Sequence, residues 1–333
     1  MSLLLIQQLA FQKVSVYQEK IMSYSVFIDG AAGTTGLQVH DRLQKRIELS
    51  LYVLDDQQRK DADARAKAMA NADVTILCLP DEAAIQATQM AKVSGARLID
   101  ASSAHRTATD FTYGFAEIRQ GQQDAIRSAQ LVSNPGCYPT GFLGLVSPLR
   151  QAGLLSSSVQ LSAFCVSGYS GGGKTMIARY EGKGEPAFAA YGLHLSHKHL
   201  PEMKQHAGLD HAPVFLPSVG DFAQGMLVNI PLHQNQFTRA VKADDIRSVF
   251  ADHYLSADLV SVGTETSLTD FGFLSADPLA GTDRLELFVF ANSENSQFML
   301  TARLDNLGKG AAGAAVQNLN LMLGIEPLVG LHY

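Results

Sequence analysis

Residues 24–36 carry the pattern that most constrains the fold of this chain. Tyr24–Asp29 is a short run of residues typical of a β-strand, and it leads directly into the glycine-rich segment Gly30-Ala31-Ala32-Gly33-Thr34-Thr35-Gly36. An amphipathic helical pattern then extends from Leu37 to Ile47. Glycines between a strand and a helix let a pyrophosphate reach the N–H groups at the helix start, because they carry no Cβ.

The spacing G-x-x-G-x-x-G differs from the commoner G-x-G-x-x-G, so the motif by itself fits a dinucleotide site and a plain tight turn equally well. The segments that follow it favour the dinucleotide site. Strand patterns recur at Leu49–Leu54, Asp73–Leu79 and Arg97–Asp100, and helical patterns at Ala62–Ala72 and Asp81–Val93 separate them. This alternation predicts a Rossmann-type, doubly wound parallel α/β sheet. We therefore expect the turn to bind a dinucleotide, with contacts from Gly30, Ala32, Gly33, Thr34, Thr35 and Gly36.

The charges after the second predicted strand leave the choice between NAD and NADP open. Asp55 and Asp56 suit the ribose hydroxyls of NAD, whereas Arg59 and Lys60 suit the extra phosphate of NADP. Cys78 lies within the third predicted strand, and we expect it to be a buried core thiol.

Composition excludes several classes of protein. A hydrophobic share of 46% against 17% charged residues provides for a packed core, and a net charge of −6 disfavours nucleic acid as a partner. Three cysteines cannot form a disulfide framework, and their scarcity is typical of a reducing, cytoplasmic compartment. Residues 1–21 lack a basic region, a long apolar run and a cleavage site, so we interpret them as an extension outside the fold and expect no membrane span.

Cys137 stands apart from the other cysteines because it lies in the segment Ser133-Asn134-Pro135-Gly136-Cys137-Tyr138-Pro139-Thr140-Gly141. A helical pattern follows at Phe142–Leu149, which places Cys137 at or just before a helix N-terminus. The helix dipole and the free N–H groups there lower the pKa of a thiol and can stabilise an oxyanion on a bound carbonyl. A buried structural cysteine is the alternative, but the preceding Asn-Pro-Gly disfavours a buried strand, so we predict a nucleophile.

A thiolate beside a nicotinamide-binding fold indicates hydride transfer between a thioester and an aldehyde, and this chemistry needs an acid–base group. Among several histidines between residues 194 and 211, the segment His197-Lys198-His199-Leu200-Pro201-Glu202 is the most distinctive. Pro201 and Glu202 favour a helix start, so we expect His197 and His199 in an exposed loop before it. Zinc binding is the alternative, but no H-E-x-x-H motif or cysteine pair supports it, so we predict no metal.

A second glycine-rich loop follows the strand-like run Val159–Val166 and reads Gly168-Tyr169-Ser170-Gly171-Gly172-Gly173-Lys174-Thr175, which matches the phosphate-binding pattern G-x-x-x-x-G-K-[ST]. A nucleotide hydrolase or kinase that uses Lys174 and Thr175 is therefore a second hypothesis. The first glycine turn and the short helical pattern after Thr175 weigh against it. We expect this loop to line the site and bind phosphate without hydrolysing a nucleotide. A third hypothesis is a catalytically silent dinucleotide sensor without a reactive thiolate.

Several segments, taken in order, resemble the N-acetyl-γ-glutamyl-phosphate reductase family in its short (type 2) form, within the semialdehyde dehydrogenase-like group. The resemblance runs from Met22 to about Gly324. Its segments are Asp29–Leu37, Ile76–Pro80, Asp100–Arg106, Asn134–Thr140, Ser167–Lys174, His197–Glu202 and Asp305–Ala315. The sequence Pro-Gly-Cys-Tyr-Pro-Thr around the cysteine fits neither aspartate-semialdehyde dehydrogenase nor glyceraldehyde-3-phosphate dehydrogenase.

The resemblance implies the reversible, NADPH-dependent reduction of N-acetyl-L-glutamyl 5-phosphate to N-acetyl-L-glutamate 5-semialdehyde and phosphate, a step of arginine biosynthesis. Cys137 would attack the acyl phosphate, phosphate would leave, and the thioester would accept a hydride. His199 is our first choice for the acid–base residue, by its place in the H-x-H-x-P-E pattern, and His197 is the second. Glu202 would orient this pair.

The resemblance also implies the residues around the substrate and the cofactor. For the anionic substrate we expect Arg106, Asn134, Ser170, Lys174 and Glu202. For NADP(H) we expect Arg59 or Lys60 near the 2′-phosphate, with further contacts from Leu79, Pro80, Ser102, Gly171, Gly172, Asn306 and Gly308. Glycines of the turn Gly308–Gly313 would let the helix Ala314–Leu323 approach the nicotinamide side.

Two domains are expected after the extension. Residues 22–136, with the returning segment 302–333, form the dinucleotide domain, and residues 137–301 form a catalytic and oligomerisation α+β domain. The strands expected in the second domain are Val159–Val166, Gly225–Pro231 and Leu285–Ala291, with Gln297–Leu304 leading back, and Ala240–Tyr254 is an expected helix. A strand-rich second domain is typical of subunit contacts, so we expect a homo-oligomer, a dimer or tetramer, that acts on a small molecule.

Overall fold

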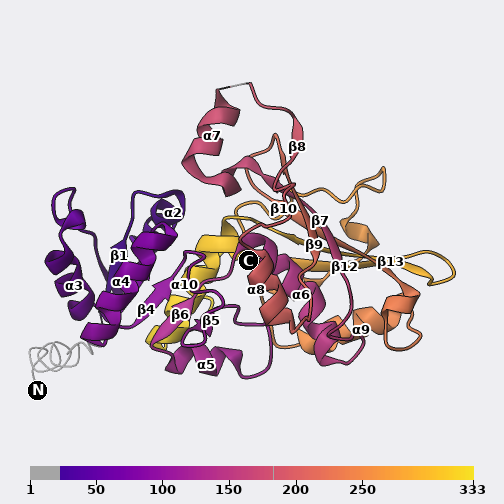
Figure 1. The fold of residues 1–333 in the computed structure, drawn as a ribbon, viewed down its shortest axis with the longest axis horizontal. Helices are drawn as coiled ribbons and strands as arrows, with labels where there is room; N and C mark the ends of the chain where they lie inside the picture. Colours follow the sequence, from indigo (N-terminus) through magenta and orange to yellow (C-terminus); the bar gives the residue numbers. More distant parts are fainter. Residues whose placement is uncertain (1–22, 183) are drawn as a thin grey trace, which may run out of the picture.

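The computed structural model describes residues 23–182 and 184–333, and the expected N-terminal extension lies outside them. The described chain forms two sheets at opposite ends of its long axis, each with its own helices (Figure 1). The strands of the first sheet come from residues 24–133, and those of the second come from residues 162–304.

The first sheet has six parallel strands in the order β2-β1-β3-β4-β6-β5. Their bounds are Tyr24–Asp29 (β1), Leu49–Tyr52 (β2), Val74–Leu77 (β3), Leu98–Asp100 (β4), Thr112–Tyr113 (β5) and Leu131–Ser133 (β6). The strand order reverses between β1 and β3, and doubly wound sheets bind their ligands at such a switch point. The predicted Rossmann-type sheet is confirmed.

Helices cover both faces of this sheet. On one face, α3 and α4 share a core with Phe27, which includes Met69. On the other face, α2, α5 and α10 share a core with Ile28, which includes Leu319. The helix bounds are Thr34–Leu43 (α2), Ala62–Asn71 (α3), Asp81–Ser94 (α4), Gln122–Ser128 (α5) and Gly313–Leu323 (α10). The C-terminal helix α10 thus packs on the first sheet.

The second sheet has seven strands of mixed direction in the order β11-β12-β13-β10-β7-β9-β8. Their bounds are Ser162–Gly168 (β7), Phe188–Ala190 (β8), Val214–Gly220 (β9), Met226–His233 (β10), Val260–Val262 (β11), Leu285–Ala291 (β12) and Gln297–Leu304 (β13). Helices α6 (Cys137–Gln151), α8 (Leu200–Ala207) and α9 (Ala243–His253) pack on one face of it around a single large core.

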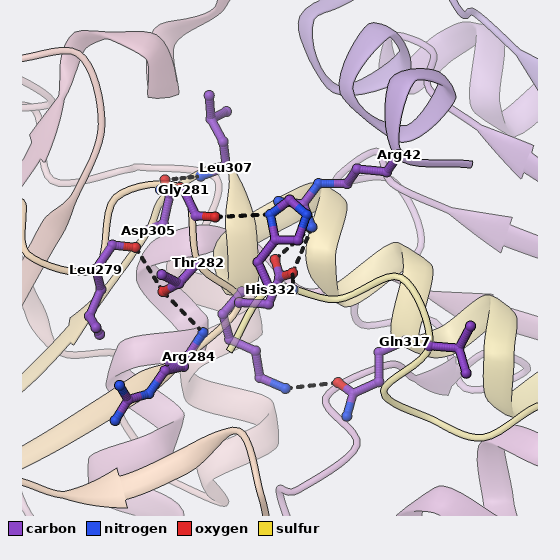
Figure 2. Close-up of polar contacts among 12 residues, drawn as sticks. Arg42, Leu279, Gly281, Thr282, Arg284, Asp305, Leu307, Gln317 and His332 are labelled. Atoms are coloured by element: carbon purple, nitrogen blue, oxygen red, sulfur yellow. Dashed lines mark hydrogen bonds and ion pairs between the residues drawn. The ribbon is translucent and has the colours of Figure 1, made fainter. Parts of the chain in front are cut away.

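Arg42 of α2 and His332 near the chain end both bind the loop before β12, and these contacts join the two halves (Figure 2). Nη1 of Arg42 donates to both carboxylate oxygens of Asp283, at 2.8 and 2.7 Å. The backbone N–H of His332 donates to the same carboxylate at 2.8 Å. A Cβ on Gly313, the first residue of α10, would lie 1.9 Å from Asp283 Oδ1, so only glycine fits there. The helix that follows the glycine turn is therefore tied to the second sheet.

Most predicted elements are confirmed, with small shifts at their ends. β1, β12 and β13 have the predicted bounds, whereas the helix predicted to reach Ile47 ends at Leu43. Cys78 differs from expectation, because it lies one residue beyond β3 and is only partly buried. The short strands β5, β8 and β11, the longer β9, and helix α5 were not predicted, because their segments lack a clear period of apolar residues.

Candidate active site

The first glycine turn lies at the switch point of the first sheet, between the ends of β1 and β3. Gly30 has a φ of +90°, and a Cβ there would lie 2.4 Å from the backbone oxygen of Cys78. A Cβ on Gly36 would lie 2.4 Å from the backbone oxygen of Gly30. Neither position accepts a side chain, so these glycines let the strand, the turn and α2 pack closely.

The N–H groups at the start of α2 are open to an anion, because the N-cap residue, Gly33, has no side chain that could cap them. A cavity of about 370 Å³ lies beside them, lined by Gly33, Thr34, Thr35, Leu79 and Lys174 among others. The second glycine loop reaches the same place, because Gly173 begins α7 (Gly173–Glu181) and a Cβ on it would lie 3.8 Å from Thr34 Oγ1. Two uncapped helix N-termini and a lysine fit the pyrophosphate of a nicotinamide dinucleotide.

A larger cavity of about 390 Å³ adjoins this one, and Thr34 and Thr35 line both. Cys137 lines the larger cavity as the first residue of α6, directly after the N-cap Gly136. The sequence-predicted site residues around it are Thr34, Thr35, Arg106, Asn134, Cys137, Ser170, Gly171, Gly172, His197, His199 and Asn306. The structure therefore brings the predicted nucleophile, both histidines and both glycine loops together. We call this space the catalytic cavity.

Burial raises the pKa of the Cys137 thiol to about 11. Arg106 and the backbone N–H groups of Cys137 and Tyr138 lower this pKa, but the loss of hydration has the larger effect. The expectation of a lowered thiol pKa is therefore wrong for the protein without substrate. At pH 7 Cys137 is a neutral thiol, so its use as a nucleophile requires a base.

His199 is buried at the N-cap of α8, so the expected exposed loop is wrong for this residue. Burial, with a smaller effect of Arg106 and His197, lowers its pKa well below the usual value. The ring is therefore neutral at pH 7 and able to accept a proton. Its Nδ1 has no hydrogen-bond partner among the described residues.

His197 lines the catalytic cavity, is partly exposed, and contacts both the backbone and the ring of His199. Its Nδ1 accepts a hydrogen bond from the backbone N–H of His199 at 3.2 Å, and the two ring centroids lie 4.7 Å apart. Burial and the charge of Lys198 lower the pKa of His197 as well. Both predicted histidines are thus neutral near pH 7, and His199 is the more enclosed of the two.

Glu202 holds the turn before the nucleophile. Its Oε1 accepts hydrogen bonds from the backbone N–H of Gly136 at 2.8 Å and from the Tyr113 hydroxyl at 2.7 Å. Its Oε2 accepts from Nη1 of Arg106 at 3.2 Å. Glu202 is 1% exposed and is not among the residues that line the catalytic cavity. It therefore differs from the expectation, because it binds the backbone and Arg106 instead of the substrate or the two histidines.

Because Gly136 has no side chain, three other side chains approach closely to the backbone directly before Cys137. A Cβ at this position would lie 2.4 Å from Arg106 Nη1, 2.8 Å from His199 Nε2 and 3.0 Å from Glu202 Oε2. Arg106 also donates from Nε to the backbone oxygen of Asn134 and from Nη2 to that of Ala101. A guanidinium has five N–H donors, so two remain for an anion in the cavity.

Gly310, which sequence reasoning missed, packs directly against Cys137. It belongs to the π-helical turn Gly308–Ala312, and a Cβ on it would lie 2.8 Å from the Cβ of Cys137. Gly308 differs from the expectation: a Cβ on it would lie 1.9 Å from the backbone oxygen of Thr282, and it lines neither cavity. Its missing side chain serves packing between the two halves.

Lys309, another missed residue, anchors this turn with a buried charge. It is 1% exposed and donates to both oxygens of Glu117 at 2.8 and 2.7 Å and to Gln317 at 2.8 Å. Gln317 also donates to Glu117 at 2.7 Å. A lysine within a run of glycine and alanine was the only signal in the sequence.

Two predicted amides hold loops of the catalytic cavity in place. Asn306 donates to the Ser170 hydroxyl at 2.9 Å and accepts from the backbone N–H of Gly225 at 3.0 Å. Asn134 donates to the backbone oxygen of Ala311 at 2.9 Å and accepts from Asn318 at 3.1 Å.

The other predicted residues lie away from the catalytic cavity. Arg59 and Lys60 form an exposed turn after β2, where Arg59 pairs with Asp56 at 3.1 Å. Ser102 donates to the carboxylate of Asp100 at 2.7 Å, and Pro80 precedes α4 as its N-cap. Gly30 and Ala32 belong to the first glycine turn, Gly36 lies in the first turn of α2, and Lys174 lies beside them.

No helix within residues 23–182 and 184–333 is long and apolar enough to cross a membrane. In the same residues, no group of His, Cys, Asp and Glu side chains is placed to hold a metal ion.

Comparison with known proteins assigns both halves of the chain to families. Residues 25–128 match the semialdehyde dehydrogenase NAD-binding domain, and residues 137–306 match the semialdehyde dehydrogenase dimerisation domain. The N-acetyl-gamma-glutamyl-phosphate reductase of Trichormus variabilis is 48% identical over 317 residues, which are 92% of this chain and 98% of that protein. The protein of the same name from Brucella anthropi is 47% identical over 309 residues, which are 91% and 99% of the two chains.

Solved structures share the fold at much lower identity. Aspartate semialdehyde dehydrogenase II of Vibrio cholerae is 17% identical with a TM-score of 0.71, over 91% of this chain and 99% of that one. Aspartate semialdehyde dehydrogenase of Candida albicans, solved with NADP, is 13% identical with a TM-score of 0.63, over 90% and 98% of the two chains. From its near-complete match to relatives of almost half identity, the chain belongs to the N-acetyl-gamma-glutamyl-phosphate reductase family of nicotinamide-dependent oxidoreductases.

Proposed function

We propose that this protein reduces N-acetyl-L-glutamyl 5-phosphate to N-acetyl-L-glutamate 5-semialdehyde and phosphate, reversibly and with NADPH, through a thioester on Cys137. The observation that carries this proposal is the place of Cys137: it begins α6 in one cavity with His199 and Arg106, next to the dinucleotide turn. The names of the close relatives supply the substrate.

The chain's own residues account for formation of the thioester. His199 is unprotonated and its Nε2 lies beside Gly136, directly before Cys137, so it is the base placed to accept the proton of the Cys137 thiol. The sulfur then bonds to the acyl carbon, the carbon–oxygen bond to phosphate breaks, and phosphate leaves with the electron pair. Free N–H groups at the start of α6 are suited to the oxyanion that forms in between. A bound nicotinamide would supply the hydride to the acyl carbon; the carbon–sulfur bond would then break, which releases the aldehyde and returns Cys137 as a thiol after it regains a proton from His199.

The anionic groups of the substrate require cationic partners in the catalytic cavity. Arg106 retains two N–H donors there, and Lys198 also lines the cavity. We assign the substrate phosphate or carboxylate to Arg106, because a fixed guanidinium can bind an oxyanion through two hydrogen bonds. Lys174 lies with the cofactor turn, so we now assign it to the cofactor phosphates.

NADP as the specific cofactor rests on the charges after β2. Oδ1 of Asp55 accepts the backbone N–H groups of Gln57 and Gln58, at 2.9 and 2.8 Å, so this carboxylate holds the turn that carries Arg59 and Lys60. Asp56 is paired with Arg59, which is still about half exposed. We assign Arg59 and Lys60 to the 2′-phosphate. Replacing Arg59 with Ala raises the KM for NADP and leaves the KM for NAD unchanged, if this assignment is right.

We also propose that the protein is a homo-oligomer built on the second sheet. The sheet face turned away from α6 presents apolar side chains to solvent, with Phe164 46%, Val214 57% and Met299 37% exposed. A second copy of the chain is the natural cover for such a face. The matched dimerisation domain includes these strands. We place the enzyme in the cytoplasm, where its three cysteines remain thiols.

The reverse reaction tests the proposed activity. The protein is supplied with N-acetylglutamate 5-semialdehyde, NADP and phosphate, and NADPH absorbance is followed for the wild type and for Cys137→Ser. We expect phosphate-dependent NADPH formation that vanishes in the variant. Folded wild type that binds NADP but forms no NADPH would contradict the proposal and favour a silent dinucleotide sensor.

A further inference from the structure

Two tyrosines line the catalytic cavity beside the nucleophile, and the reaction proposed above uses neither. Tyr138 is the second residue of α6, directly after Cys137, and Tyr191 directly follows β8. The backbone N–H of Tyr191 donates to the backbone oxygen of Pro217 in β9 at 3.0 Å, which holds Tyr191 at the cavity wall. The ring centroid of Tyr191 lies 6.1 Å from that of His197.

The hydrogen bonds of these tyrosines determine the direction in which the Tyr191 hydroxyl donates. The Tyr138 hydroxyl donates to the backbone oxygen of Ser218 at 3.0 Å, since a carbonyl oxygen can only accept. The Tyr191 hydroxyl lies 3.2 Å from the Tyr138 hydroxyl and must donate to it, because Tyr138 has no second proton. The Tyr191 oxygen therefore keeps its lone pairs for a donor in the cavity.

The Tyr191 oxygen is a neutral acceptor. Burial raises the pKa of Tyr191 to about 12, so the hydroxyl stays protonated throughout the neutral pH range. No described residue donates a hydrogen bond to this oxygen. A partly buried acceptor that the protein leaves unused is suited to an N–H or O–H group of a ligand.

The charges around the catalytic cavity favour one kind of N–H group. Arg106 and Lys198 line the cavity, and no Asp or Glu does so among the described residues. The carboxylate of Glu202 is buried and already bound to Arg106. An ammonium group would enter this cavity without a carboxylate of the protein to pair with, and burial of an unpaired charge is costly. A nitrogen that acylation has made neutral avoids this cost and still offers one N–H.

We propose that Tyr191 determines specificity for an N-acylated substrate, because its hydroxyl oxygen accepts the hydrogen bond of the acylated N–H. The inference rests on the proposed function and adds to it a residue that recognises the acetamido group. The carboxamide of a bound nicotinamide has the same donor chemistry. The substrate is the better match, since Tyr191 lines the catalytic cavity with Cys137 and does not line the smaller cavity at the cofactor turn.

Two substrates that differ at one position test the assignment. In the reverse reaction, N-acetylglutamate 5-semialdehyde is compared with 2-acetoxy-5-oxopentanoate, an ester in which oxygen replaces the N–H. We expect the wild type to prefer the amide in kcat/KM by about tenfold, the usual effect of one neutral hydrogen bond. Tyr191→Phe keeps the ring and should lose this preference, because only the amide loses a hydrogen-bond acceptor.

The controls separate this role from packing and from cofactor binding. Tyr333→Phe removes a hydroxyl from a side chain that is 65% exposed and should keep the wild-type preference. A packing fault in Tyr191→Phe would lower kcat/KM for the amide and the ester alike, and so leave the preference in place. NADP is also compared with its 3-acetylpyridine analogue, which lacks the carboxamide N–H, and Tyr191→Phe should leave the ratio of their kcat/KM values unchanged.

Several results would overturn the inference. A wild type without preference for the amide, or a Tyr191→Phe variant that retains it, would show that Tyr191 does not bind the acylated N–H. A changed ratio for the two cofactors, with an unchanged ratio for the two substrates, would assign Tyr191 to the nicotinamide. A wild type that turns over neither substrate would contradict the proposed function itself, and the inference with it.

Discussion

The carboxylate of Glu202 accepts the backbone N–H of Gly136 at 2.8 Å, and Gly136 is the residue directly before Cys137. The same side chain binds Arg106 and Tyr113, so one buried acid holds both the start of α6 and the Arg106 guanidinium. The nucleophile is thus positioned from α8 as well as from its own helix.

Replacing Glu202 with Gln should test this positioning. The amide keeps the shape, but it leaves the buried guanidinium of Arg106 without its charge partner. Breaking a buried ion pair from one side destabilises a protein by about 3–5 kcal/mol. We expect a lower midpoint of thermal unfolding and a reduced kcat. The matched control, Glu82→Gln, alters an exposed acid of α4 and should change neither. Wild-type kcat in Glu202→Gln would contradict the role of Glu202.

A methyl group on Gly136 should disrupt the site directly. It would lie 2.4 Å from Arg106 and 2.8 Å from His199, so both side chains must move. We expect Gly136→Ala to lose most of its kcat/KM while the KM for NADP changes little, because the cofactor turn is separate. Gly184→Ala serves as control, since no atom lies within 4 Å of an added Cβ there. A fully active Gly136→Ala would show that this crowding has no role.

The raised pKa of Cys137 predicts slow alkylation in the protein without ligands. With a pKa of about 11, roughly 0.1% of the thiol is ionised at pH 8, whereas an ordinary thiol is about a quarter ionised. The rate of iodoacetamide labelling of Cys137, followed by peptide mass spectrometry, should rise with pH toward a midpoint near 11. Arg106→Gln should move this midpoint higher, because Arg106 lowers the pKa. A midpoint near 8.5 in the wild type would refute the dominance of burial.

The two histidines should differ in their importance. His199 is more deeply buried and has the pKa that is lowered further, so we expect His199→Asn to reduce kcat by about 10²–10⁴-fold. His197→Asn removes a hydrogen bond to the His199 backbone and should have the smaller effect. Steady-state kinetics of both variants decides the order. The reverse order would make His197 the acid–base residue.

Lys309 provides a test of the turn behind Cys137. Lys309→Met leaves the buried carboxylate of Glu117 without its partner, and we expect a loss of about 3–5 kcal/mol in the free energy of unfolding. Adding Glu117→Leu removes the uncompensated charge and should recover most of this loss. Denaturant titrations of the single and double variants measure the difference. A single variant as stable as the wild type would show that the pair does not anchor the turn.

The sequence predicted those parts of the fold that have strong local patterns. The glycine turn 30–36 and the long strands β12 and β13 follow from local spacing and apolar periodicity. The predicted pairing of Cys137 with His197 or His199 came from the acid–base group that a thiolate nucleophile requires, and the family resemblance supported it, although Cys137 lies far from both histidines in the sequence.

What could not be predicted depends on packing between distant segments. Burial of His199 and the raised thiol pKa arise because α8, α6 and the turn 308–312 meet, and no local pattern records that meeting. The sequence around Gly308 and Gly313 resembles a ligand-binding turn. In the structure both glycines instead pack against the loop before β12, where an added Cβ would meet Thr282 or Asp283.

The central claim is that Cys137 carries the acyl group, and a reaction without phosphate tests it most directly. The enzyme is mixed with N-acetylglutamate 5-semialdehyde and excess NADP, the NADPH formed is measured by stopped flow, and the protein is then analysed by mass spectrometry. We predict a burst of one NADPH per active site and an N-acetylglutamyl group on the peptide that contains Cys137, both discharged into steady turnover when phosphate is added. Full turnover without a burst, or the same labelling in Cys137→Ser, would contradict the account.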